Sequence, residues 1–361
     1  MSVFSSDSFD NHEQVMFCSD PASGLKAIIA IHSTALGPSV GGVRMWNYES
    51  EEEAIRDVLR LSRGMSYKNA LANLNLGGGK AVIIGDSSKD KTPELMRAYG
   101  RFIDSLGGRY ITAEDMGMTT ADMAQVASQT KFVAGLEEGA AASGDPSPFT
   151  SHGVLIGIDA AVRHQMGRDN LNGIRVAIQG VGHVGYALAQ ELVHRGAEII
   201  VADVVKDNVA RAVAELGATA VSTAEILFQD VDVLAPCAMG AIVNDQTLPL
   251  LKCRIIAGSA NNQLARTDHG QALRARGILY APDYVINAGG MISVANEVHG
   301  VLVPHDEAMK MVEKIGHVLR RIFADADAQG LPTEAIADQT AEALIAAGKA
   351  EKSGRAQSAA A

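Results

Sequence analysis

The chain of 361 residues is long for one hydrophobic core, because single cores stop growing at roughly 250 to 300 residues, so two domains are expected. Its net charge is −11, from 31 basic and 42 acidic side chains, which argues against nucleic acid or an anionic membrane as partner and favours a small molecule. Three cysteines without metal-ligand spacing, no signal peptide and no apolar run of about 18 residues predict a reduced, cytoplasmic protein outside the membrane.

The pattern of the first half predicts an α/β domain. A buried strand is predicted over 24–32, and a turn over 36–42 leads into a second short strand. A capping box of Ser50 and Glu53 then begins an amphipathic helix, which carries Lys68 at its far end. Lys68 is either an exposed surface charge, which is the commoner case, or a clamp for a substrate carboxylate.

Three consecutive glycines, 77–79, precede Lys80 at the start of an apolar, β-branched run. Because glycine has no Cβ, a substrate or another backbone can approach closely there. A lysine beside such a crowded, partly dry pocket loses hydration, which lowers its pKa and can make it a base near neutral pH. A phosphate-binding loop is excluded, because Leu74 and Ala81 stand where that motif needs a glycine and a hydroxyl. The alternative is a glycine-rich turn whose lysine lies in solvent.

Two carboxylates follow the next predicted strand. A helix capped by Thr92 comes first, and the strand over 109–112 then runs into Glu114 and Asp115. The carboxyl ends of strands are where α/β sheets place their chemistry. We interpret one of the two acids as a cap for the helix beginning near residue 119 and the other as a proton-transfer group.

The second half begins with a strand over 175–179, which a G-x-G-x-x-G motif, a helix and a strand ending in Asp203 follow at once. An acidic residue about 20 positions after the motif completes the dinucleotide-binding fingerprint. The glycines let a pyrophosphate reach helix N-terminal amides, and Asp203 binds ribose hydroxyls and repels a 2′-phosphate, so NAD is preferred over NADP. The nearby Lys206 instead favours NADP. The motif residues assigned to the cofactor are Gly180, Gly182, His183, Val184 and Gly185.

Strands and helices continue to alternate, which predicts a parallel, doubly wound sheet. The further strands are expected over 218–221, 231–234, 254–257 and 278–280. Two strand ends carry small residues and amides that suit the nicotinamide end of a dinucleotide: Cys237 and Ala238, then Asn261 and Asn262. With no histidine nearby in the sequence, Cys237 is interpreted as an inert packing thiol rather than a nucleophile. Two helical stretches are expected from about residue 331, with a frayed tail over 349–361.

Together these motifs resemble the amino-acid dehydrogenase superfamily of glutamate, leucine, valine and phenylalanine dehydrogenases, most strongly its leucine-acting members. The segments that carry the resemblance run from about residue 13 to about residue 347: the upstream Lys68, GGGK with Lys80, AEDMG with Asp115, GVGHVG, APCAMG, SANNQ and PDYVINAGG. The resemblance implies two α/β domains with a deep cleft between them. It also implies reversible NAD-dependent oxidative deamination of an L-amino acid to a 2-oxo acid, ammonium and NADH.

The resemblance also implies roles for single residues. Lys80 would be the base that activates water, Asp115 would carry protons to and from the substrate nitrogen, and Lys68 would bind the substrate carboxylate. Thr150 and Asn262 match positions that hold the nicotinamide amide and the substrate amine side. No metal-ligand cluster is expected.

The expected domain organisation follows from the same family resemblance. Residues 1–138 would form a substrate-binding and oligomerisation domain, which C-terminal helices in 331–361 would join, and residues 149–330 would form the NAD-binding domain. The small, polar segment 139–148 is interpreted as the crossing and hinge between them. A homo-oligomer built from dimers, up to an octamer, is expected.

Substrate choice has one readable clue. Glutamate dehydrogenases have a lysine just before the glycine pair that corresponds to Gly41 and Gly42, and a serine at the position of Val294, whereas this chain has Val40. A glutamate side chain without these partners would bury an uncompensated charge at a cost of several kcal/mol. We therefore predict a branched-chain substrate, leucine, valine or isoleucine. The expected pocket comprises Val40, Gly41, Gly42, Met65, Asn262, Met291 and Val294.

Two alternatives stay open. One is a phenylalanine or tryptophan dehydrogenase on the same scaffold, which a larger pocket would distinguish. The other is a catalytically silent NAD-binding sensor, which would keep the fingerprint but need not keep Lys68, Lys80 and Asp115 together. All three residues are present, which argues against the sensor.

Overall fold

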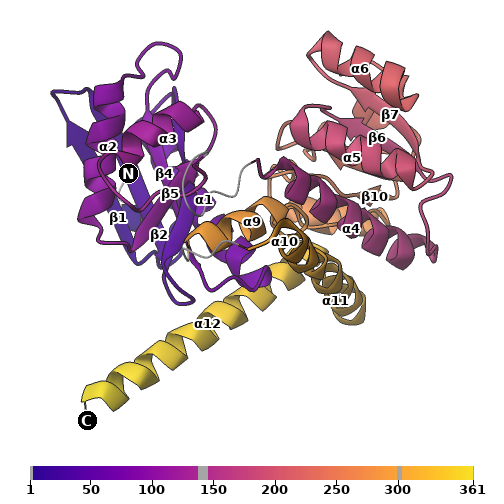
Figure 1. Cartoon of the computed structure of the whole chain (residues 1–361). Coiled ribbons are helices and arrows are strands. Elements are labelled where there is room, and N and C mark those ends of the chain that lie inside the picture. Colours follow the sequence, from indigo (N-terminus) through magenta and orange to yellow (C-terminus); the bar gives the residue numbers. More distant parts are fainter. Residues whose placement is uncertain (1–2, 137–144, 299–302, 361) are drawn as a thin grey trace. The chain divides into compact units, whose positions relative to one another are not determined.

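The structure is a computed structural model of the chain, and it describes residues 3–136, 145–298 and 303–360. Contacts divide the chain into two compact units (Figure 1). Unit 1 comprises Met1–Gly144, Val294–Leu302 and Thr340–Ala361, and unit 2 comprises Asp145–Ser293 and Val303–Gln339. These units differ from the expected domains in two segments, since 294–302 falls in unit 1 and 331–339 falls in unit 2. Most of the predicted crossing, up to residue 144, lies outside the described residues.

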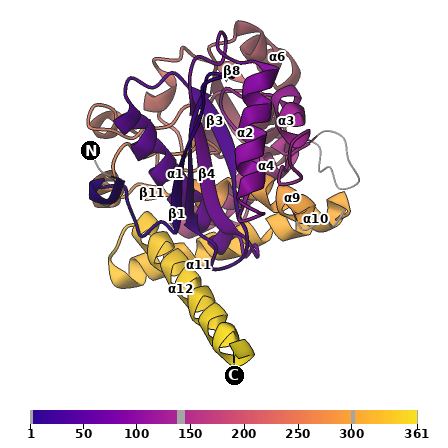
Figure 2. The ribbon, with the colours of Figure 1, turned by 90° about the vertical axis from the view of Figure 1, so that its left-hand side faces the viewer.

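Unit 1 is built on a mixed five-stranded sheet of order β1-β2-β4-β3-β5, of which Figure 2 labels β1, β3 and β4. Its strands are β1 (Gln14–Asp20), β2 (Leu25–Ser33), β3 (Ser39–Trp46), β4 (Gly77–Ile84) and β5 (Tyr110–Glu114), and its helices include α1 (Glu51–Leu71), α2 (Pro93–Ser105) and α3 (Thr120–Ala127), with a 3-10 turn, η1 (Val3–Ser5), before them. β3 runs parallel to both β4 and β5, while β2 is antiparallel to β1 and β4. The strand expected over 24–32 is confirmed as β2.

The two faces of this sheet bury different helices. Successive side chains of a strand point to opposite faces, so the apolar residues of each strand divide between two cores. On one face Ala81 and Ile83 of β4 pack in a cluster with residues of α2 and α3. On the other face Val82 packs in a cluster with Val58 and Leu59 of α1. Lys80, two residues before Val82, therefore lies on the α1 face.

The helix starts follow the sequence only in part. Ser50 Oγ accepts the Glu53 N–H, as a capping box requires, but the Glu53 carboxylate accepts the Glu49 N–H instead of that of Ser50. Thr92 caps α2 as predicted. The assignment of Glu114 or Asp115 as a cap for α3 is wrong, because Thr119 and Asp122 form a complete capping box there.

Unit 2 contains a six-stranded sheet of order β11-β10-β9-β6-β7-β8 in which every strand is parallel. The strands are β6 (Arg175–Gln179), β7 (Glu198–Ala202), β8 (Thr219–Ala220), β9 (Val233–Pro236), β10 (Ile255–Ile256) and β11 (Leu279–Tyr280). The order reverses between β6 and β9, and such a switch point opens a crevice at the carboxyl ends of the strands. The prediction of a doubly wound parallel sheet is confirmed.

The remaining helices are α4 (Ser147–Met166), α5 (His183–His194), α6 (Lys206–Leu216), α7 (Asp268–Ala275), α8 (Asp283–Ile286), α9 (Gly289–Val298), α10 (His305–Val312), α11 (Lys314–Gln329) and α12 (Thr333–Ala360), with short 3-10 turns η2 (Ile226–Phe228) and η3 (Leu248–Leu250). The prediction of two helical stretches with a frayed tail is wrong, because α12 is one helix that continues to Ala360. Within the described residues, no helix is both long and apolar enough to cross a membrane.

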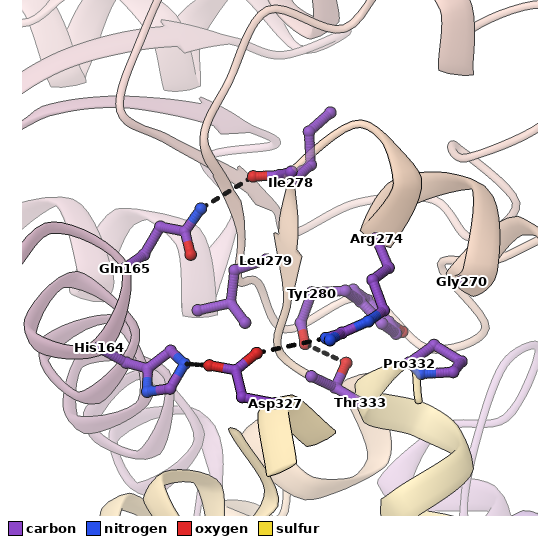
Figure 3. A pocket seen from close by; sticks show the side chains of 11 residues that line it. His164, Gln165, Gly270, Arg274, Ile278, Leu279, Tyr280, Asp327, Pro332 and Thr333 are labelled. Atoms are coloured by element: carbon purple, nitrogen blue, oxygen red, sulfur yellow. Dashed lines mark hydrogen bonds and ion pairs between the residues drawn. The ribbon is translucent and has the colours of Figure 1, made fainter. Parts of the chain in front are cut away.

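A cavity of about 270 Å³ lies beside the edge strand β11 (Figure 3). Its ionisable groups satisfy one another: Asp327 contacts His164 Nε2 at 3.0 Å and Arg274 Nη1 at 3.3 Å. Thr333 Oγ1 donates to the Tyr280 carbonyl at 2.6 Å. None of the residues expected to bind substrate or cofactor lines this cavity.

Glu334, next to Thr333 on α12, holds a carboxyl group over Gly270. A Cβ at Gly270 would lie 1.5 Å from Glu334 Oε1, so only glycine leaves room for this carboxyl group. Glu334 Oε2 is buried and has no hydrogen-bond partner within the described part of the chain. Burial raises the pKa of Glu334 to about 7 from a usual value of 4.5, and nearby Asp338 adds to the increase.

The raised pKa predicts how stability depends on pH. The folded protein binds the Glu334 proton more tightly than the unfolded chain, so this stabilisation is present below pH 4.5 and is lost as pH rises through about 7. Replacing Glu334 with glutamine, which cannot ionise, should leave Tm unchanged at pH 4 and raise it above wild type at pH 8. Thermal unfolding at both pH values measures this. The exposed Glu313→Gln is the control, and an equal difference from wild type at the two pH values would contradict the prediction.

Candidate active site

Lys80 and Asp115, predicted from separate motifs, are in direct contact in unit 1. Lys80 Nζ lies 2.7 Å from Asp115 Oδ2, and their side chains are 8% and 22% exposed. Lys80 comes from β4, and Asp115 directly follows β5. β3 lies between these strands, so the contact spans three neighbouring strands of the sheet. The interpretation of Lys80 as a solvated turn residue is wrong.

Glycines make this contact possible by removing side chains from the α1 face. A Cβ at Gly42 would lie 2.8 Å from the Cβ of Asp115, and a Cβ at Gly41 would lie 1.8 Å from the Gly79 carbonyl oxygen. Real Cβ atoms essentially never come closer than 3.0 Å to such neighbours. The missing side chain at Gly42 therefore leaves the space that Asp115 occupies above β3. The missing side chain at Gly41 lets β3 and β4 lie close together.

The glycines of β4 also admit helix α1. A Cβ at Gly78 would lie 2.0 Å from the backbone nitrogen of Ser66. Asn69 Nδ2 donates to the Gly77 carbonyl at 2.6 Å and fixes the same part of the helix against the strand. Lys68, half-buried, directly precedes Asn69, so its position along β4 is set by these contacts.

A third charged residue, Arg44 of β3, completes the cluster. Its Nε donates to Asp115 Oδ2 at 3.3 Å, and its Nη1 donates to Asp57 Oδ2 of α1 at 2.9 Å. Burial would raise the pKa of Asp115, but Lys80 and Arg44 outweigh it and hold that pKa at about 2. Asp115 is therefore an anion at neutral pH, in contact with both Lys80 and Arg44.

The side chains expected to line the substrate pocket lie in different parts of the fold. Val40 of β3 is fully buried, and Met65 of α1 is half-buried beside Gly41. Met291 and Val294 both lie on α9, the first in unit 2 and the second in unit 1. The structure brings together Gly41 with Met65 and Gly42 with Asp115.

The G-x-G-x-x-G motif of unit 2 forms the turn between β6 and α5. Gly180 has φ 92°, which favours glycine, and a Cβ there would lie 2.7 Å from the Cβ of Ala238. A Cβ at Gly185 would lie 2.0 Å from the Gly180 carbonyl oxygen, so this glycine lets α5 begin close to the strand. Nothing lies within 4 Å of a Cβ placed at Gly182, which leaves the start of α5 open. His183 and Val184 then form the first turn of α5.

The open start of α5 faces a cavity, and Asp203 secures the turn behind it. The cavity measures about 530 Å³, and Gly182, His183 and Arg211 are among its lining residues. Asp203 Oδ2 accepts the Val181 N–H and Oδ1 accepts the Val205 N–H, both at 2.8 Å. Each oxygen of an ionised carboxylate has a second acceptor site, so Asp203 can still bind hydroxyl groups.

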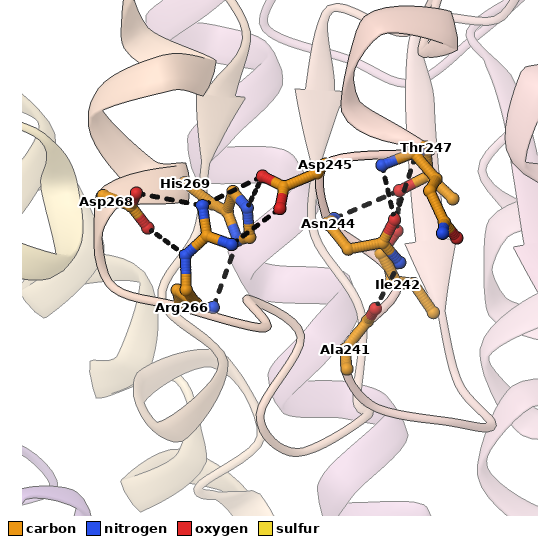
Figure 4. Close-up of polar contacts among 9 residues, drawn as sticks. Ala241, Ile242, Asn244, Asp245, Thr247, Arg266, Asp268 and His269 are labelled. Atoms are coloured by element: carbon orange, nitrogen blue, oxygen red, sulfur yellow. Dashed lines mark hydrogen bonds and ion pairs between the residues drawn. The ribbon is translucent and has the colours of Figure 1, made fainter.

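The loops after β9 and β10 are tied to each other. The Ala241 N–H donates to the Asn262 carbonyl at 2.6 Å, and Asn261 Oδ1 accepts from Asn287 Nδ2 at 2.8 Å. Farther along the same loops, Arg266 binds both oxygens of Asp245 at 2.7 and 2.9 Å (Figure 4). A bidentate pair of this kind fixes orientation as well as distance. These contacts hold the two strand-end segments together.

Cys237 and Thr150 are both engaged with the backbone. The Cys237 N–H donates to the Gln179 carbonyl at 2.7 Å, and burial raises the pKa of the Cys237 thiol, which supports its interpretation as a packing thiol. Thr150 Oγ1 donates to the Pro146 carbonyl at 3.1 Å. A Cβ at Gly290 would lie 2.8 Å from that hydroxyl, so Thr150 lies against the start of α9.

Two family profiles match the chain. Residues 12–132 match the dimerisation domain of the Glu/Leu/Phe/Val dehydrogenases, and residues 203–346 match the glutamate/leucine/phenylalanine/valine dehydrogenase profile. The chain belongs to this dehydrogenase family. It is therefore an amino-acid dehydrogenase, an oxidoreductase that acts on a CH–NH2 group with a pyridine nucleotide.

Relatives of this dehydrogenase share most of its length. Leucine dehydrogenase of Geobacillus stearothermophilus is 54% identical over 93% of this chain and 91% of its own. Valine dehydrogenase of Streptomyces coelicolor is 48% identical over 95% and 94%. The crystal structure of L-tryptophan dehydrogenase from Nostoc punctiforme superposes with a TM-score of 0.81 at 45% identity, covering 94% of this chain and 97% of that one.

The residues of unit 2 suit the pyridine nucleotide that the family implies. Nothing lies within 4 Å of the position that a Cβ would take at Gly182, so a phosphate group can reach the N–H groups at the start of α5. The positive end of the helix dipole lies at the same place. The turn, the open helix start and Asp203 thus supply an anion site followed by an acceptor for hydroxyl groups.

Arg44 was missed by the sequence reasoning. The signal was an arginine inside the otherwise apolar segment GGVRMW, two residues after Gly42 and so on the same face of the strand. A charge within such a strand is rarely buried without partners. The pattern could have flagged Arg44 as paired, but it could not name Asp115 and Asp57 as the partners.

Proposed function

We propose that this dehydrogenase catalyses the NAD-dependent, reversible oxidative deamination of a branched-chain L-amino acid. The substrate, L-leucine and also L-valine or L-isoleucine, would react with NAD+ and water to give the 2-oxo acid, ammonium, NADH and a proton. The observation that carries the proposal is the contact of 2.7 Å between Lys80 and Asp115. Support for the substrate class comes from relatives named leucine dehydrogenase, which are 52% to 54% identical over at least 93% of this chain.

The nitrogen chemistry is assigned to residues of unit 1. When bound, the nicotinamide would supply the acceptor for the hydride of the substrate Cα, whose loss leaves an iminium carbon. Lys80 takes a proton from water as the water attacks this carbon. Since Lys80 Nζ contacts Asp115 Oδ2 directly, the proton passes to Asp115 through one hydrogen bond and from there to the departing nitrogen. Lys68 binds the substrate carboxylate as its fixed counter-charge.

Cofactor binding is assigned to residues of unit 2. The pyrophosphate would be held by the N–H groups at Gly182, His183 and Val184, and the adenosine ribose hydroxyls by Asp203. An ionised Asp203 would repel a 2′-phosphate, so NADP+ is expected to be the poorer cofactor despite Lys206 nearby. Thr150, Cys237, Ala238, Asn261 and Asn262 would surround the nicotinamide end.

The apolar residues support a branched-chain side chain. Val40 is fully buried, and Val294 is 9% exposed, so neither offers a partner to a substrate carboxylate. A glutamate side chain there would lose its hydration without compensation. A specific observation favours a second candidate, an aromatic substrate, because relatives named phenylalanine and tryptophan dehydrogenase are each 45% identical to this chain.

The deciding experiment is NADH formation from NAD+ with L-Leu, L-Val, L-Ile, L-Phe, L-Trp and L-Glu, each compared by kcat/KM. The branched-chain set is expected to be preferred, with L-Glu inactive. Preference for L-Phe or L-Trp would keep the chemistry and overturn the pocket assignment. Inactivity on the whole panel, with NADH still bound in a fluorescence titration, would support the sensor instead. Repeating the best substrate with NADP+ tests the role of Asp203.

We also propose a cytoplasmic homo-oligomer built from dimers, with the octamer as its largest form. The match of residues 12–132 to a dimerisation domain supports association, and three free cysteines fit a reducing compartment. Size-exclusion chromatography with light scattering should give a mass that is an even multiple of 37.8 kDa. A mass of one chain would refute the assembly without touching the proposed reaction.

A further inference from the structure

We propose that Arg44 is a positioning residue of this reaction, which holds Asp115 in place and ionised while Lys80 exchanges protons, and that Asp57 and Tyr48 hold Arg44 in turn. The inference rests on the proposed function and extends it to three residues outside its catalytic set. It is carried by the contacts of one guanidinium group with two carboxylates.

The guanidinium group of Arg44 is fixed at both ends. Nε donates to Asp115 Oδ2 at 3.3 Å and Nη1 donates to Asp57 Oδ2 at 2.9 Å. The hydroxyl of Tyr48 donates to the same Asp57 oxygen at 2.7 Å, so Asp57 is itself held in place. The Arg44 side chain is only 16% exposed, which reduces competition from water for these contacts.

The fold leaves Arg44 little choice of partner. Arg44 lies on β3, which pairs with β4 on one side and with β5 on the other. It points to the α1 face, as Gly42 does, and Gly42 makes room there for Asp115. Asp57 reaches the same place from α1. Helix α1 and the segment after β5 therefore each place a carboxylate against the guanidinium group that β3 carries.

The contacts on Asp115 explain why a second cation is needed. Lys80 Nζ and Arg44 Nε both contact Oδ2 of Asp115. Whenever Lys80 gives up its proton, it no longer neutralises the carboxylate, and a buried carboxylate without a cation would retain a proton. Arg44 does not deprotonate in proteins and keeps its charge throughout. It thus lets Asp115 release each proton it receives.

Other polar groups around the pair are one further carboxylate and two phenols. Asp57 is already paired with Arg44. Tyr48 and Tyr110 stay neutral because burial raises the pKa of both phenols. A lysine in place of Arg44 would keep the positive charge but would have to contact both carboxylates from a single nitrogen, whereas the planar guanidinium offers separate donors on two sides.

The test compares Arg44→Met, Arg44→Lys and Asp57→Asn with wild type in L-leucine deamination across pH. Arg44→Met should lower kcat about 10- to 100-fold with KM changed less than about threefold, because the substrate-binding residues are untouched. It should also move the acid limb of the kcat profile to higher pH, since removing a positive charge makes protonation of the Lys80 and Asp115 pair easier. Arg44→Lys should lower kcat with a smaller shift of that limb, and Asp57→Asn should lower kcat least.

A merely structural role would lower Tm without moving the acid limb. Arg97→Met, which removes ion pairing with Glu94 elsewhere in unit 1, is the matched control and should retain the wild-type pH profile. An Arg44→Met enzyme with the wild-type acid limb would overturn the inference, as would the same shift in Arg97→Met. Should Arg44→Met fail to fold, Arg44→Lys decides by the same readout, the shift of the acid limb to higher pH. If the wild-type protein were inactive on L-leucine, the proposed function itself would be refuted. Failure of the inference about Arg44 and failure of the proposed function therefore give different results.

Discussion

Replacing Lys80 with methionine is expected to lower kcat for amino-acid deamination about a thousandfold. Methionine keeps much of the length of the lysine side chain but cannot take a proton from water, and general-base catalysis contributes about 10²- to 10⁴-fold. Asp115 would keep Arg44 as its counter-ion, at 3.3 Å, so the variant should fold. Steady-state NADH formation on L-leucine measures the loss.

Binding of NADH should survive this change, because the residues proposed to bind the cofactor belong to unit 2 and Lys80 belongs to unit 1. A fluorescence titration of NADH on the variant checks this and shows that the protein is intact. The matched control is Lys89→Met, which removes an exposed lysine paired with Asp86 in the same unit. More than a tenth of wild-type kcat in Lys80→Met would exclude Lys80 as the base.

Replacing Gly78 with alanine is expected to lower the free energy of unfolding by about 3 kcal/mol, the upper end of the usual cost of overpacking. The added methyl group would lie 2.0 Å from the Ser66 nitrogen and 2.4 Å from its Cα, so helix α1 has to move away from β4. Because the obstacle is backbone, no side-chain rotation relieves it. Thermal unfolding should show a Tm roughly 6 to 12 °C lower.

Gly64→Ala on the same helix provides the opposite expectation. Nothing lies within 4 Å of a Cβ at Gly64, and alanine is favoured over glycine inside a helix by about 0.5–1 kcal/mol. Its Tm without substrate should therefore be equal to or above that of wild type. If Gly78→Ala is as stable as Gly64→Ala, the close approach of α1 to β4 does not exist in solution.

Local patterns predicted much of the fold and part of the site. The G-x-G-x-x-G turn, β2 and the Thr92 cap were readable because each depends on a few consecutive residues. Lys80 could be singled out for the same reason, but the choice of Asp115 over Glu114 came only from family resemblance. The contact between Lys80 and Asp115 was not predicted, since the order of β4, β3 and β5 in the sheet decides it.

The two wrong predictions have different causes, one local and one long-range. The prediction placed the cap of α3 at Glu114 or Asp115, whereas Thr119 and Asp122 form the capping box, and their spacing is visible in the sequence. The C-terminal region was divided into two helical stretches with a frayed tail, but α12 continues through Gly348. A Cβ at Gly348 would lie 2.7 Å from Leu36 Cδ2, so this glycine serves close packing rather than the end of a helix. Sequence alone does not show which neighbour a glycine admits.

The alternation of faces along β4 restricts how this chain can evolve. Lys80 lies on the α1 face and Ala81 on the opposite face, within the core under α2 and α3. Inserting or deleting one residue between Gly77 and Lys80 would exchange the two faces and bury the lysine among apolar side chains. Substitutions in this segment can be tested one by one, but its length cannot drift. Loop grafting and insertional libraries should therefore leave residues 77–80 intact and place their changes in length elsewhere.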